Sequence, residues 1–226
     1  MQRRWLGRTN RQVFPLWVRG TPPRTEPTLE QVAAFFEKLQ LLGVEVLDIT
    51  PSHGFWGSCL RVHQPSLQVA IVTPANLLAY TPGSLHAARA VQAHLIEVLC
   101  AIGRERCDYY LLNGAPLLDE AQLSGALEAL ELARQEGQIG ALGLAAYGDP
   151  LRTLALWRTH DAFELVLLPD QPAVLQTLLP EARARRVGVL VEALELALAQ
   201  APDKYEALLR ARGADAVLLK GTIPVE

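Results

Sequence analysis

An acidic residue and a histidine lie five positions apart in the segment from Asp48 to Gly54, directly after a compact apolar run at 44–47. A carboxylate can orient a proton donor, and a histidine exchanges protons near neutral pH. Barrel and doubly wound enzymes hold their chemistry at strand ends. Asp48 and His53 are therefore candidate catalytic residues. The structural alternatives stay open, since Asp48 can bind loop N–H groups and His53 can pack on an aromatic neighbour.

Other candidates occupy the ends of later predicted strands. Lys220 stands out because lysine is scarce in this chain, and a desolvated amine can act as a Schiff-base nucleophile, although a solvated lysine is the alternative. Glu192 can face Asp48 as a paired acid or bind a neighbouring loop. The remaining pocket candidates, which can orient a small ligand or simply close the barrel top, are Thr73, Asn113 and Tyr147.

Composition excludes several classes of protein. Hydrophobic residues make up 50% and charged residues 20%, which is typical of a globular chain. A formal charge of −3 gives no reason to expect nucleic acid or an anionic membrane as a partner. The three cysteines lack metal-ligand spacing, and neither a signal sequence nor an apolar run of membrane-spanning length is evident. We expect a cytoplasmic protein with no metal site.

Short apolar runs alternate with amphipathic segments along the chain, and the boundaries carry helix signals. Thr28, with Gln31 three residues later, predicts a capping box for a helix that reaches about Leu42. Ser84 is expected to cap a long helix that ends near Ile102. Strands are expected at 16–19, 44–49, 67–73, 108–113, 139–146, 164–168, 187–191 and 216–219, and further helices at 121–136, from 149, near 173–186 and at 203–212.

Eight strands joined by crossover segments predict an α/β protein, a (β/α)8 TIM barrel, as one domain over residues 1–226. Several strands are continuously apolar, as strands buried on both faces should be. The segments 3–6 and 12–14 predict an N-terminal β-hairpin ahead of the barrel.

Several segments resemble the aldo-keto reductases in order along almost the whole chain. Residues 4–16 resemble the hairpin that opens that family, and residues 47–54 are similar to its Asp-Thr-Ala-x-x-Tyr-Gly loop. Residues 108–116 resemble its Asp-x-x-x-Leu-x-His-x-Pro strand. The closest match, residues 126–143, resembles the helix and strand that precede its Ser-Asn pair. Residues 187–190 and 214–221 resemble its seventh and eighth strands.

The resemblance implies a catalytic Asp, Tyr, Lys and His, with NADPH as the hydride donor. Asp48 keeps the Asp. The Tyr position falls on His53, the Lys position on about Pro74 and the His position on Asn113, so these three replacements remove the usual proton-donor network. We therefore expect Asp48, His53 and Asn113 at the tetrad-equivalent positions.

The resemblance also implies depleted cofactor contacts. The Ser-Asn pair for the nicotinamide amide falls on Ala145 and Ala146, and its Gln partner falls near Leu167. The aromatic residue that stacks on the nicotinamide falls on Glu192. The sequence ends at Glu226, before the expected phosphate-binding loop, its arginine and the final helix of the barrel. We expect no cofactor, and NADPH if there is one.

Three functions remain open from the sequence. The first is a binding or regulatory barrel that has lost NADPH-dependent reduction. The second is a divergent oxidoreductase with His53 as the proton donor, and the third is a different enzyme that uses Lys220 with Glu192 or Asp48. Without the final helix, outward-facing Val217, Leu219 and Trp17 are expected to be exposed. A protein partner or a second copy of the chain is then expected to cover this seam, with a small ligand at the mouth.

Overall fold

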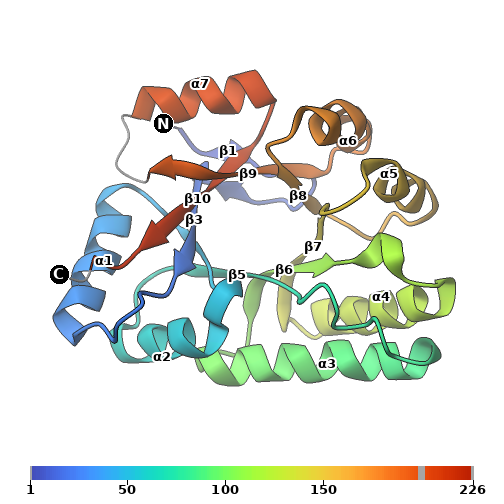
Figure 1. Cartoon of the computed structure of the whole chain (residues 1–226), viewed down its shortest axis with the longest axis horizontal. Helices are drawn as coiled ribbons and strands as arrows, with labels where there is room; N and C mark the ends of the chain where they lie inside the picture. Colours follow the sequence, from blue (N-terminus) through green and yellow to red (C-terminus); the bar gives the residue numbers. More distant parts are fainter. Residues whose placement is uncertain (1, 198–201, 225–226) are drawn as a thin grey trace.

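The protein is a closed parallel barrel surrounded by helices, seen in a computed structural model that describes residues 2–197 and 202–224 (Figure 1). Within these residues eight strands close in the order β10-β3-β4-β5-β6-β7-β8-β9. Their bounds are β3 (Leu16–Thr21), β4 (Val46–Asp48), β5 (Gln68–Val72), β6 (Cys107–Asn113), β7 (Ile139–Ala145), β8 (Leu165–Pro169), β9 (Gly188–Ala197) and β10 (Ala216–Thr222). The predicted (β/α)8 barrel is confirmed.

Helices connect successive strands on the outside of the barrel. They are α1 (Leu29–Leu41), α2 (His53–His63), α3 (Gly83–Ile102), α4 (Glu120–Gln135), α5 (Pro150–Thr159), α6 (Pro172–Ala184) and α7 (Pro202–Arg212), with short 3-10 turns η1 (Thr50–Ser52) and η2 (Ala115–Leu117). The strand β10 is the last element within the described residues. The alternation places the carboxyl ends of all barrel strands at one mouth.

Local sequence signals explain where these helices begin. The Thr28 side chain accepts from the N–H of Gln31, and the Gln31 side chain accepts from the N–H of Thr28, so the predicted capping box is confirmed. Asp119 and Gln122 form the same motif ahead of α4. The predicted cap of α3 is wrong, because the helix begins at Gly83, one residue before Ser84, and its first residue follows Pro82.

An N-terminal hairpin closes the bottom of the barrel, as predicted. Its strands are β1 (Arg4–Trp5) and β2 (Gln12–Val13), paired antiparallel. Leu6 and Val13 are buried in the same cluster as the side chains that fill the barrel interior. Gly7 has φ +49°, and a Cβ there would overlap the backbone at Val187 and Gly188, so this turn needs glycine to approach the base of β9.

The expected exposed seam beside β10 is not found. Val217 and Leu219 are 0% exposed, because α7 contacts β10 from one side and Phe35 of α1 lies near Gly221 on the other. Trp17 does not share their face. It is the register partner of Leu218, not of Val217, and it points into the barrel, where its ring centroid lies 4.5 Å from that of Tyr109. The expectation that these three residues face water is therefore wrong.

The helix α3 is long and apolar enough, by length and composition alone, to cross a membrane, although the sequence was expected to contain no such run. In the barrel it is one helix of the outer ring and packs against α2 and α4 (Figure 1). A helix packed in a soluble protein meets the same criterion, so this is weak evidence for a membrane span.

Candidate functional site

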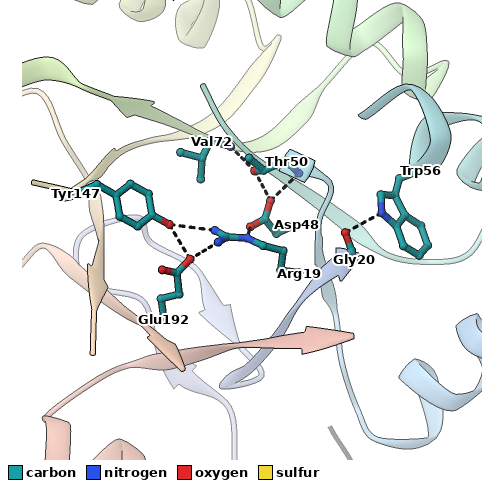
Figure 2. A network of polar contacts seen from close by, with 8 residues as sticks. All are labelled: Arg19, Gly20, Asp48, Thr50, Trp56, Val72, Tyr147 and Glu192. Atoms are coloured by element: carbon teal, nitrogen blue, oxygen red, sulfur yellow. Dashed lines mark hydrogen bonds and ion pairs between the residues drawn. The ribbon is translucent and has the colours of Figure 1, made fainter. Parts of the chain in front are cut away.

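The side chain of Arg19 occupies the barrel mouth (Figure 2). Alternation along β3 sends Leu16 and Val18 outward under the helices, whereas Trp17 points inward, so Arg19 also points inward, one layer above Trp17. Arg19 Nε donates to Asp48 Oδ2 at 2.6 Å, and Nη1 forms an ion pair with Glu192 Oε1. Its Nη2 lies 3.3 Å from the hydroxyl of Tyr147. One guanidinium thus links Asp48 at the end of β4 to Glu192 within β9 and to Tyr147, two residues after β7.

The carboxylate of Asp48 is fully engaged. Its side chain is 2% exposed, at the end of β4 next to Arg19 in register. While Oδ2 accepts from Arg19, Oδ1 accepts from the backbone N–H of Thr50 at 2.9 Å and from the Thr50 hydroxyl. The Thr50 hydroxyl oxygen in turn accepts from the N–H of Val72 at 2.8 Å. Asp48 therefore fixes the turn after β4 as well as Arg19.

Tyr147 and Glu192 complete the group from the opposite side. The Tyr147 hydroxyl donates to Glu192 Oε1 at 2.6 Å. Burial raises the pKa of Tyr147 above its ordinary value, and Glu192 adds to that rise, whereas Arg19 opposes it. The phenol is consequently a weak acid that stays protonated near neutral pH. We call Arg19, Asp48, Tyr147 and Glu192 the mouth quartet.

Arg19 remains positively charged within the quartet. Burial by itself lowers the pKa of Arg19, but Asp48, Tyr147 and Glu192 more than offset that effect and raise the pKa above its ordinary value. The guanidinium of Arg19 therefore faces the carboxyl groups of both Asp48 and Glu192. The arrangement resembles a structural ion-pair network more than a free acid awaiting a substrate.

The space beneath the quartet is almost filled. The cavity there has a volume of about 10 Å³ and is lined by Asp48 together with apolar interior side chains such as Trp17, Leu111 and Leu167. That volume approaches the minimum for one water molecule. A groove of about 820 Å³ lies elsewhere, between α4 and the segment ahead of β8, lined by residues such as Arg8 and Glu164. Among the described residues, the cavity beneath Asp48 offers a ligand no deep site.

The structure places His53 away from the quartet. His53 begins α2, and its Nε2 lies 2.9 Å from Glu97 Oε1 on α3. Its ring centroid is 6.1 Å from that of His94, whose Nδ1 is hydrogen-bonded to the Tyr110 hydroxyl at 2.7 Å. Among the contacts of the described residues, none joins His53 to Asp48. The role of His53 as a proton donor stays a prediction.

The other candidates are distributed around the rim. The backbone N–H of Asn113 donates to the hydroxyl of Thr73 at 2.9 Å, and this bond ties the ends of β5 and β6 together. Lys220 is exposed near the end of β10, next to Arg19 in register. Asp48, Glu192 and Tyr147 are thus brought together, Lys220 lies beside Arg19, and Thr73 and Asn113 form a separate pair.

Arg19 is the central residue that sequence reasoning missed. The available signal was a charged residue that ends an otherwise apolar strand, Leu16 to Val18, and keeps the inward parity of Trp17. An inward-facing charge at a strand end requires partners, and the acids at the ends of other predicted strands were the available ones. The pairing itself depends on which strands adjoin in the closed barrel.

The residues at the expected nicotinamide positions do not fit that group. Ala145 and Ala146 are buried and offer no side-chain donor or acceptor, and the N–H of Ala146 is already bound to the carbonyl of Leu167. The Leu167 side chain is apolar and 0% exposed. Glu192 is engaged by Arg19 and Tyr147. A carboxamide placed there would lose its hydrogen bonds to water without replacement.

No family model and no curated protein matches the chain, whereas many solved structures do. A protein from Pseudomonas aeruginosa, provisionally described as an aldo-keto reductase, has a TM-score of 0.71 at 20% identity, covering 97% of this chain and 89% of its own. The holo form of an aldo-keto reductase from Bacillus halodurans has a TM-score of 0.71 at 16% identity, covering 98% and 86%.

An aldose reductase from Schistosoma japonicum has a TM-score of 0.65 at 15% identity, covering 98% of this chain and 83% of its own. At these identities the likeness concerns the fold and leaves substrate and activity open. The resemblance found in the sequence is confirmed at that level: the chain has the barrel fold of the aldo-keto reductases.

Proposed function

We propose that this protein is a binding or regulatory barrel on the aldo-keto reductase fold, without NADPH-dependent carbonyl reduction. The observation that carries the proposal is the commitment of Asp48 to Arg19 and Thr50. In a reductase, an acid at this position would tune a proton donor, but here both of its oxygens are already bound to other partners. The protonated Tyr147 offers no replacement, because its pKa is raised.

The ligand, in this proposal, is a small molecule held at the rim of the mouth in a cytoplasmic protein. The packed interior beneath Asp48 supports a rim position over a deep one. Exposed Lys220 and half-buried Asn113 supply polar contacts there. A small ligand with a polar head and little apolar bulk suits such a surface better than a dinucleotide does.

Isothermal titration of the full chain with NADPH and with NADP tests the proposal. We expect no saturable heat, which corresponds to a dissociation constant weaker than about 1 mM. A parallel assay follows NADPH absorbance with a panel of aldehydes and ketones, and we expect no turnover above the rate without protein. Micromolar binding together with turnover would overturn the proposal.

If turnover is observed, a variant of His53 tests the alternative that the protein is a divergent oxidoreductase with His53 as its proton donor. If turnover is found, His53→Ala should abolish it when the imidazole is the proton donor, whereas His86→Ala, on the exposed side of α3, serves as the matched control. Turnover that survives His53→Ala would assign the proton to another group.

A further inference from the structure

The outward face of α3 and α4 carries three large apolar side chains that are exposed. Leu85 and Ile96 on α3 are each 58% exposed, and Leu132 on α4 is 48% exposed. Only 33% of the most apolar window of α3 is buried inside the chain. The two helices lie side by side along the lower edge of Figure 1 and pack closely on one another. This side of the barrel therefore leaves substantial apolar area uncovered.

A groove of about 280 Å³ runs between these helices. Small residues form its floor, namely Ala88, Gly125 and Ala129, and Leu85 and Leu132 stand at its margins. The helices approach each other so closely here that a Cβ on Gly125 would overlap the backbone of Ser84. The same surface thus carries both protruding leucines and a shallow hollow of matching apolar character.

Charges of both signs lie at or near the groove. Glu128 on α4 lines it, and Arg89 on α3 follows the groove residue Ala88 directly in sequence. Both are exposed, and among the described residues neither has a hydrogen bond or an ion pair. Nearby charged residues are already paired, as Glu131 is with Arg134 and Glu97 with His53. Arg89 and Glu128 remain available to an external partner.

We infer that the α3–α4 face is the contact surface of a two-fold symmetric dimer of this chain. In such an interface the same patch is used on both subunits, so the patch has to be complementary to itself. This face meets that condition, since each copy supplies leucines for the hollow of the other, and Arg89 of each copy can pair with Glu128 of the other. A lipid surface would leave both charges unpaired in an apolar medium.

The inference does not depend on the barrel mouth, because the face lies on the helical ring. Sedimentation and light scattering of the wild-type chain at about 100 µM should give twice the 24.8 kDa mass of the monomer, as for a moderately stable interface. Leu132→Glu should weaken the dimer at least about tenfold, because a charge would enter the apolar contact. Leu151→Glu, at a 67% exposed leucine on α5, should leave the mass unchanged.

A charge exchange tests the pairing even if Leu132→Glu perturbs folding. Arg89→Glu and Glu128→Arg should each weaken self-association, since each homodimer would then place like charges together twice. A mixture of the two variants should form a heterodimer about as stable as the wild-type dimer, because both contacts regain opposite charges. Pairing within one chain would give no such recovery on mixing.

Several results would overturn the inference. A wild-type monomer at 100 µM would do so, as would a dimer that Leu132→Glu leaves intact. Failure of the two charge variants to associate on mixing would exclude the Arg89–Glu128 contact and with it this two-fold arrangement. Binding of the monomer to phosphatidylcholine vesicles, lost in Leu132→Glu, would assign the face to a membrane.

Discussion

The Nε of Arg19 donates to Oδ2 of Asp48 at 2.6 Å, across the ends of two adjacent strands of the barrel. Both side chains are largely buried, with 12% and 2% exposed. A buried charge is tolerated only when paired, so each residue requires the other in the folded state. The pair lies at the mouth of the barrel, where the aldo-keto reductase resemblance places chemistry.

Replacing Arg19 by an apolar side chain should destabilise the fold strongly. Arg19→Met leaves Asp48 and Glu192 close together without their cation, and breaking a buried ion pair in this way costs about 3 kcal/mol or more. Arg19→Lys keeps the charge but loses the planar fork, and a smaller loss is expected. Urea unfolding at pH 7 measures both. A loss below about 1 kcal/mol in Arg19→Met would show that the network contributes little.

Gly20, the residue after Arg19, is hydrogen-bonded to Trp56 and packed closely against it. The indole Nε1 donates to the carbonyl of Gly20 at 2.8 Å, and a Cβ on Gly20 would lie 2.7 Å from Cζ2 of the indole (Figure 2). Gly20→Ala should therefore cost about 2–4 kcal/mol through overpacking in a rigid interior. Gly54→Ala, where an added Cβ meets nothing within 4 Å, is the control for thermal unfolding. Equal melting temperatures would contradict the clash.

Local sequence patterns predicted the eight barrel strands, the capping box of α1 and, among the helices of the described residues, all except α2, because these features depend on near neighbours. The residues of the mouth quartet were harder to predict from the sequence, since Arg19 contacts Glu192 only after β9, β10 and β3 come together. The face of Trp17 was misassigned because its direction depends on register with Leu218, which no local pattern fixes. The contact of His53 with Glu97 could not be predicted for a related reason, because it depends on how α2 packs against the neighbouring helix.

Alkaline solution should weaken the fold through Tyr147. Because its pKa is raised in the folded state, the unfolded chain loses this proton first, above its ordinary pKa of about 10. The stability from this group is fully present below pH 10 and is lost as pH rises towards the folded pKa, by up to about 1.4 kcal/mol per pH unit. Urea unfolding between pH 8 and 11 measures this slope.

Tyr147→Phe provides the comparison. At pH 8 the variant should be less stable by about 1 kcal/mol, because Glu192 loses a hydrogen bond. Its stability should fall less steeply than that of the wild type above pH 10, so the two curves converge. Parallel curves throughout this range would mean that the folded state does not hold the phenolic proton more tightly.

Acid solution should weaken the packing of α2 on α3 through His94. Burial lowers the pKa of His94, and the charge of His53 lowers it further, whereas Glu97 opposes the change. The unfolded chain therefore binds this proton first as pH falls below about 6.5. Stability from the neutral imidazole is present above that pH and is lost as pH falls through the folded pKa, by at most about 1.4 kcal/mol per pH unit.

His94→Gln keeps a polar partner for the Tyr110 hydroxyl and removes the titration. We expect the difference in unfolding free energy between wild type and variant to shrink as pH falls from 7.5 to 5, because only the wild type must then retain a neutral imidazole against protonation. His86→Gln, at an exposed position on the same helix, should leave the pH profile unchanged. A constant difference for His94→Gln would show that the buried imidazole is protonated as readily in the folded chain as in the unfolded one.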